Sequence, residues 1–122
     1  MNLISWNYRR LGALHAVREL TKMVNRYKPQ ILFLMETKRR SNGMEWLRLK
    51  WKFDKCFTVE GMARGEGLAL LWIKELKAEV RSYSRYHIDV RIEEVKKGRA
   101  WSFIGFYENP KTSKCQCSWE IL

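Results

Sequence analysis

The sequence has little of what several protein classes depend on. It holds three cysteines and two prolines in 122 residues. The odd number of cysteines argues against a disulfide framework, and Cys115 and Cys117 are too close for a zinc knuckle, which separates its ligands by about two to four residues. We therefore expect an intracellular, reducing environment, with nothing in the sequence to choose between nucleus and cytoplasm.

Aspartate and histidine are equally scarce. The chain contains only Asp54 and Asp89, and only His15 and His87. A mechanism that requires several aspartates or a Ser-His-Asp set has few residues to draw on. His87 and Asp89 share one face of their predicted strand, but the alternation around them is that of an ordinary half-buried strand, so we assign them no role as a base.

Long hydrophobic runs are also missing. No apolar stretch approaches the roughly 20 residues that a transmembrane helix needs. The first residues lack the positive segment and apolar core of a secretory signal. We expect no membrane partner.

Positive charge, by contrast, is abundant. The chain has 24 Lys and Arg against 13 Asp and Glu, a formal net charge of +11. Its hydrophobic content of 46% and its six tryptophans predict a packed domain over residues 1–122. The charge favours a polyanionic partner, which by charge alone fits nucleic acid, acidic lipid or an acidic protein.

The first forty residues predict a βαβ unit. Apolar residues from Leu3 to Trp6 indicate a strand that ends at Asn7, and helical spacing follows from Ala13 until Pro29. Residues 30–35 are almost continuously apolar, as in a strand buried on both faces. Two strands joined by a helix are expected to be parallel.

The rest of the chain predicts one more helix and then a series of strands. Asn42 and Glu45 have the spacing of a capping box, which predicts a helix that opens there. Residues 118–122 resemble the start of a third helix. Strands are expected over 56–60, 67–73, 80–83, 88–92 and 101–107. The resulting fold class is α/β (α+β), with one mixed sheet and the helices on one of its faces.

Asn7 and Glu36 stand where the two parallel strands end. Such ends meet at one edge of a sheet, where open α/β sheets bind ligands. One carboxylate and one amide suit Mg²⁺, which takes its other ligands from water and phosphate. Basic residues that could hold a nucleic-acid backbone follow both positions, namely Arg9, Arg10, Lys38, Arg39 and Arg40. The alternative is that Asn7 is a turn residue and that Glu36 pairs with Lys38 or Arg39 at the surface.

Four sequence blocks resemble the endonuclease/exonuclease/phosphatase superfamily. They are Asn2–Gly12, Ile31–Lys38 with its Glu-Thr-Lys ending, Gly67–Trp72, and Gly105–Tyr107. Within the superfamily, the likeness is greatest to the endonuclease-like domain of plant LINE-type retrotransposons. The resemblance implies a four-layer α/β/β/α sandwich and Mg²⁺-dependent cleavage of DNA. It implies that Glu36 is the metal ligand, that Asn7 orders the metal shell and phosphate, and that Tyr107 is the active-site tyrosine.

The family's later blocks have no counterpart here. Its Asp-x-Asn motif, a further Asp and its Ser-Asp-His motif are absent from the sequence. The chain is therefore interpreted as the first half of the domain, truncated after the tyrosine strand and catalytically incomplete. The sheet face opposite the helices is then expected to be uncovered and to cause self-association. A non-catalytic, basic nucleic-acid-binding module and a residual fragment without function are the alternatives.

Overall fold

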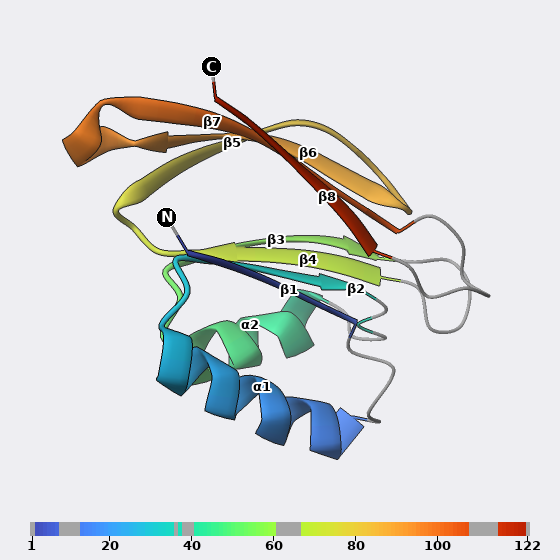
Figure 1. The fold of residues 1–122 in the computed structure, drawn as a ribbon. Coiled ribbons are helices and arrows are strands. Elements are labelled where there is room, and N and C mark those ends of the chain that lie inside the picture. Colours follow the sequence, from blue (N-terminus) through green and yellow to red (C-terminus); the bar gives the residue numbers. More distant parts are fainter. Residues whose placement is uncertain are drawn as a thin grey trace.

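The protein is built from two sheets that pack face to face, with two helices outside the first sheet (Figure 1). This computed structural model describes residues 2–7, 13–35, 37, 41–60, 67–107 and 115–121. The layers follow the order α/β/β. They correspond to three layers of the α/β/β/α sandwich that the resemblance implies for a whole domain. The predicted fold class is confirmed, but the number of sheets is two rather than one.

The first sheet has the strand order β1-β2-β4-β3. Its β1 and β2 are parallel, and the other neighbours are antiparallel. The connection between β1 and β2 is α1, so the predicted βαβ unit is confirmed. The elements of this half are β1 (Leu3–Asn7), α1 (Ala13–Tyr27), β2 (Ile31–Met35), α2 (Ser41–Lys50), β3 (Lys55–Glu60) and β4 (Gly67–Trp72).

Helix α1 and strand β2 form for the reasons that the sequence pattern indicates. One face of α1 carries Ala16, Leu20 and Val24, which are all buried against the sheet. Pro29 follows the helix because it cannot continue one. All five residues of β2 are buried, because α1 and α2 cover one face of this strand and the second sheet covers the other.

The start of α2 differs from the predicted capping box. The helix begins at Ser41, so Asn42 lies within its first turn and does not precede it. Glu45 does not reach back to the helix start: its carboxylate accepts a hydrogen bond of 2.8 Å from Nε of Arg48. The i,i+3 ion pair with Arg48 has replaced the cap.

The second sheet has the order β5-β6-β7-β8, and all its neighbouring strands are antiparallel. Its buried side chains pack on the face of the first sheet that the helices leave free. The face that we expected to be uncovered is therefore covered, and the stated reason for self-association is wrong. The elements are β5 (Leu76–Ser84), β6 (His87–Glu94), η2 (Val95–Lys97), β7 (Arg99–Tyr107) and β8 (Cys115–Ile121).

The two sheets approach most closely at Gly105. A β-carbon at this position would lie 2.8 Å from Cζ of Phe33, which is fully buried on β2. The ring of Phe33 also packs edge-on against Phe103, with 5.9 Å between the ring centroids. Glycine is needed here because of this close approach.

Strand β8 replaces the helix start predicted at 118–122. It pairs with β7 from Tyr107↔Cys115 to Trp101↔Ile121. Its larger residues, Trp119 and Ile121, recur every second position, which suits a strand as well as a helix start. The strand forms because pairing with β8 gives hydrogen-bond partners to the backbone N–H and C=O groups at the edge of β7.

Candidate functional site

The carboxyl ends of β1, β2 and β7 lie at one edge of the sandwich, the right-hand edge in Figure 1. We call this edge the rim and define it by Asn7, Met35, Gly67, His87 and Tyr107. Asn7 is the register partner of Met35, and the next strand along, β4, begins here at Gly67. Gly105, two residues before Tyr107, lies against Phe33, two residues before Met35.

The predicted site residues are only partly described. Asn7 is half-buried at the rim, and the backbone of Tyr107 ends β7 there. Glu36 lies outside the described residues, but both of its sequence neighbours belong to this edge. Met35 pairs with Asn7, and the buried Thr37 donates its backbone N–H to the carbonyl of Gly67 at 3.3 Å. Arg9, Arg10, Lys38, Arg39 and Arg40 also lie outside the described residues.

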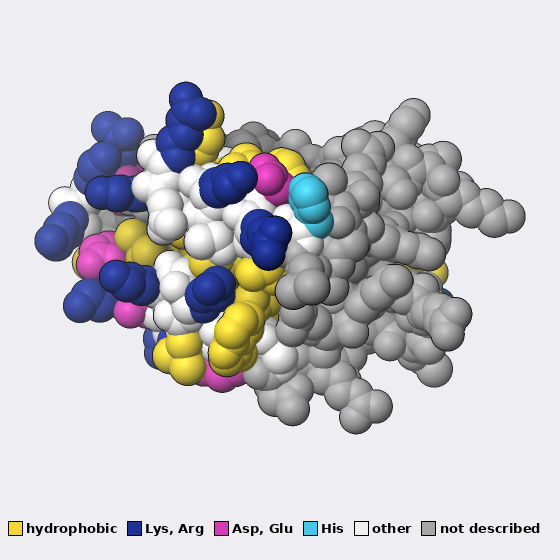
Figure 2. Space-filling view, turned by 90° about the horizontal axis from the view of Figure 1, so that it is seen from below, with side chains coloured by type: hydrophobic (Ala, Val, Ile, Leu, Met, Phe, Trp, Pro, Cys, Tyr) yellow, Lys and Arg dark blue, Asp and Glu magenta, His cyan; other side chains and the backbone are white. Residues whose placement is uncertain are grey.

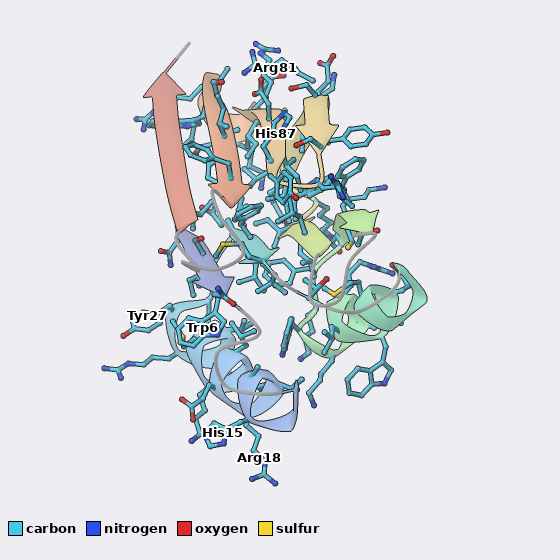
Figure 3. All side chains as sticks on the ribbon, turned by 90° about the vertical axis from the view of Figure 1, so that its right-hand side faces the viewer. Trp6, His15, Arg18, Tyr27, Arg81 and His87 are labelled. Atoms are coloured by element: carbon cyan, nitrogen blue, oxygen red, sulfur yellow. The ribbon has the colours of Figure 1, made fainter. Side chains whose placement is uncertain are left out.

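The two histidines belong to opposite outer layers. Figure 3 looks onto the rim and shows His15 and Arg18 projecting from α1, whereas Arg81 and His87 lie on the second sheet. Both sheets separate the histidines, so they form no common site. Trp6 faces the helix layer, where it packs against the core beside α1.

His87 is held by two serines and not by Asp89. Its Nδ1 lies 2.6 Å from Oγ of Ser84, and its Nε2 lies 3.2 Å from Oγ of Ser82. Asp89 accepts a hydrogen bond of 2.9 Å from Arg81 instead. This agrees with assigning no base to the pair. The tight β5–β6 turn makes Ser84 the register partner of His87, with Ser82, two residues earlier on the same strand, as the partner of Asp89. The Ser-x-Ser spacing is the signal that would have found them.

The described residues contain no group of three or more His, Cys, Asp and Glu side chains that could hold a metal ion. In the interpretation from the sequence, Glu36 and the amide of Asn7 would hold a cation at the rim, with water and phosphate as further ligands. That donor set fits Mg²⁺, which keeps several waters, and does not fit a closed zinc site.

Cations are also spread over the outer face of the helices. Arg18, Lys22 and Arg26 recur every fourth residue of α1 and are exposed, and Lys50 and Lys52 extend the cationic surface at the end of α2. Figure 2 shows Lys and Arg side chains across this face, with hydrophobic side chains among them. Trp46 is one of the exposed hydrophobic residues of α2, and Nζ of Lys50 lies 5.6 Å from its ring centroid.

Comparison with known proteins finds a likeness among solved structures alone. No family model matches the chain, and no curated protein matches it. Among solved structures, it is similar to the AP endonuclease LMAP from Leishmania major, with 18% sequence identity and a TM-score of 0.45. The match covers 99% of this chain but 39% of that one. Within the described residues, no helix is long and apolar enough to cross a membrane.

Proposed function

We propose that this chain is a nucleic-acid-binding domain of the endonuclease/exonuclease/phosphatase type that grips DNA at the rim. The observation that carries the proposal is the β1–β2 register, in which Asn7 pairs with Met35, the residue before Glu36. The same edge receives the end of β7 at Tyr107. Three strand ends distant in the sequence therefore meet at one edge, and this supports a site that uses the amide of Asn7, the carboxylate of Glu36 and the phenol of Tyr107.

Mg²⁺ is the cofactor we propose for this edge, with Glu36 as its protein ligand. When bound, the ion would polarise a phosphodiester. The amide of Asn7 orders the water and phosphate around it, and the cations that follow Asn7 and Glu36 hold the nucleic-acid backbone. The resemblance of the Asn7 and Glu36 blocks to plant LINE-type retrotransposons supports a retroelement origin.

We further propose that the domain is catalytically incomplete. Among the described residues we assign no base to the rim: His87 begins β6 at this edge, but its ring is held by two serines on the outer face of the second sheet. Loss of a positioned general base costs roughly 10²–10⁴ in rate. Binding of DNA, more than its hydrolysis, is then the activity to measure first.

Substitution of Glu36 tests the metal site. In Mn²⁺ titrations followed by electron paramagnetic resonance, with duplex DNA present, Glu36→Gln is expected to weaken Mn²⁺ binding at least tenfold, since it removes the carboxylate that we propose as the metal ligand. Glu45→Gln, which removes an exposed carboxylate on α2, is the control and should leave Mn²⁺ binding unchanged. Equal Mn²⁺ affinities of wild type and Glu36→Gln would refute the site.

Plasmid nicking with Mg²⁺ completes this test. We expect nicking to be weak or absent, and any nicking to be abolished by Glu36→Gln. Strong nicking that depends on Glu36 would refute the proposal that the domain is catalytically incomplete. Nicking that ignores the substitution would identify a contaminating nuclease.

The second candidate function is a non-catalytic module that binds nucleic acid through the helix face. The exposed row of Arg18, Lys22 and Arg26 favours it. Each phosphate contact contributes about 0.9 to the slope of log K against log[salt]. An Arg18→Ala/Lys22→Ala/Arg26→Ala variant is expected to lower the slope by roughly 2–3 only if this face carries binding.

The matched variant replaces Arg9, Arg10, Lys38, Arg39 and Arg40 by Ala, and it should lower the slope if the rim carries binding. A slope near zero in the wild type would reject both candidates and favour a residual fragment without function.

A further inference from the structure

A cavity of about 330 Å³ lies at the end of the molecule opposite the rim. It opens where α1 and α2 both end and where the chain enters β2 and leaves β4. Its size is at the lower limit of small-molecule sites, which range from about 300 to 1,000 Å³. It shares no residue with the rim, so what it binds is independent of the proposed function.

The floor of the cavity is apolar and formed by buried side chains. Val24, Trp51 and Phe53 line it and are 8%, 5% and 4% exposed. The indole N–H of Trp51 already donates to Oγ1 of Thr21 at 2.8 Å. The tryptophan therefore has no free polar atom for a ligand and offers only hydrocarbon surface, which suits a flat, apolar group.

Two lysines line the same cavity and are exposed to solvent. Lys28 follows α1 and Lys52 follows α2. Both have left-handed backbones, with φ of 46° and 61°. A β-carbon makes this conformation costly, and glycine is the residue that helices ordinarily use there. Strained positions of this kind occur at ligand clamps.

The cavity is positive in spite of the two helix ends. None of its lining residues is an Asp or Glu. The negative ends of the helices are partly compensated, because the carbonyl of Tyr27 accepts a hydrogen bond from Nδ2 of Asn2 and, at the end of α2, the carbonyl of Arg48 accepts one from the backbone N–H of Phe53. The lysine charges are thus left for a ligand.

From this combination we infer that the cavity binds a small aromatic anion. A nucleoside monophosphate represents the class: its base would lie on the apolar floor and its phosphate between Lys28 and Lys52. The apolar floor alone would accept a neutral aromatic compound, and the lysines alone would accept inorganic phosphate. The proposal requires both parts together.

The probe is adenosine 5′-monophosphate, titrated into the full chain and followed by the NMR signal of the Trp51 indole, which Trp51→Phe assigns. Saturable shifts of this signal are expected, with affinity at least tenfold above that for adenosine or for inorganic phosphate. The variant Lys28→Gly/Lys52→Gly should lose at least tenfold in affinity, yet keep or raise the melting temperature, because glycine relieves the left-handed positions. A purely structural role for the lysines predicts unchanged binding.

Two further variants close the test. Lys28→Met/Lys52→Met removes the charges but keeps a long side chain, and it should also lose affinity. If the glycine variant lowers the melting temperature because it loosens the helix ends, the methionine variant still shows whether the lysine charges bind the probe. Lys77→Ala/Lys96→Ala makes the same change in net charge on the second sheet, at two exposed residues that do not line the cavity, and should bind as the wild type does. Equal affinity for the probe in the wild type and both Lys28/Lys52 variants, or equal affinity for adenosine, would overturn the inference.

Discussion

At the scale of single residues, the ionisation of the Cys56 thiol is determined by the packing around it. It lies on β3 and packs against the core beneath α2. Burial raises the pKa of its thiol to about 11, and the nearby charge of Glu45 adds to the shift. Its chemistry in the folded state is therefore that of a small apolar residue and not of a nucleophile.

We predict slow alkylation of Cys56 in the folded protein. Two pKa units leave roughly a hundredfold less thiolate at pH 8 than in an ordinary cysteine, and only the thiolate reacts. The measurement is the rate of reaction with iodoacetamide in a Cys115→Ser/Cys117→Ser background. The urea-unfolded chain is the control and should react at the ordinary rate; equal rates in both states would contradict the prediction.

The same shift predicts a loss of stability in alkali. Because the pKa is raised on folding, the contribution of Cys56 to the free energy of unfolding is complete below its ordinary value of 9.0. It is lost as the pH rises from there through about 11, since the unfolded thiol ionises first. Cys56→Ala should remove this part of the pH dependence, as measured by urea unfolding.

At the scale of elements, α1 and α2 are joined by a polar contact within an apolar layer. The indole N–H of Trp51, just after α2, donates to Oγ1 of Thr21 on α1. Trp51 is 5% exposed, so water has little access to the N–H group. The helices are fixed relative to each other by this bond as well as by their apolar faces.

Thr21→Val is expected to destabilise the protein by about 1–2 kcal/mol, because it keeps the shape of the side chain but leaves the indole N–H without an acceptor. Urea unfolding measures the change. Thr58→Val, the same change on the half-buried β3, is the control and should stay within about 0.5 kcal/mol. In a Trp51→Phe background the cost of Thr21→Val should largely disappear; a cost that persists there would argue against the hydrogen bond.

Elements were predictable from sequence where a local pattern dominates. The helical spacing of Leu20 and Val24 and the apolar run of β2 place α1, β2 and their parallel partner correctly. The capping box failed because Glu45 has a competing partner in Arg48, three residues later. The spacing of Trp119 and Ile121 fits a strand and a helix start, and only the distant β7 decides between them.

At the scale of the whole molecule, the sandwich depends on the contact between β7 and β2. Gly105 leaves room for the ring of Phe33, and Phe103 packs edge-on against the same ring. The division into two sheets was not predictable, because nothing in the residues of a strand such as β6, which alternates between buried and half-buried positions, says which sheet it joins. The same holds for the site. The strand ends at Asn7 and Met35 are local features that the sequence predicts, whereas the meeting of β7 with these strands at the rim depends on the packing of the two sheets and was not predictable.

Gly105→Ala tests this packing. The added methyl group would lie 2.8 Å from the buried ring, and we expect a loss of about 1–3 kcal/mol from overpacking. The measurement is again urea unfolding. Phe33→Leu alone costs stability, but in the double variant it should recover part of the loss from Gly105→Ala. Full additivity of the two changes would show that the close approach is not responsible.

The chain passes from one sheet to the other a single time within its described part, through Ile73–Glu75. Every backbone pairing of the first sheet is made before this passage and every pairing of the second sheet after it. A peptide-bond break between Lys74 and Glu75, both exposed, would therefore sever no ladder. The two pieces would be held together chiefly by the apolar layer between them, besides the hydrogen bond of 3.2 Å from the backbone N–H of Leu76 to the carbonyl of Ile73. This turn is therefore the natural place to divide the protein into complementing fragments.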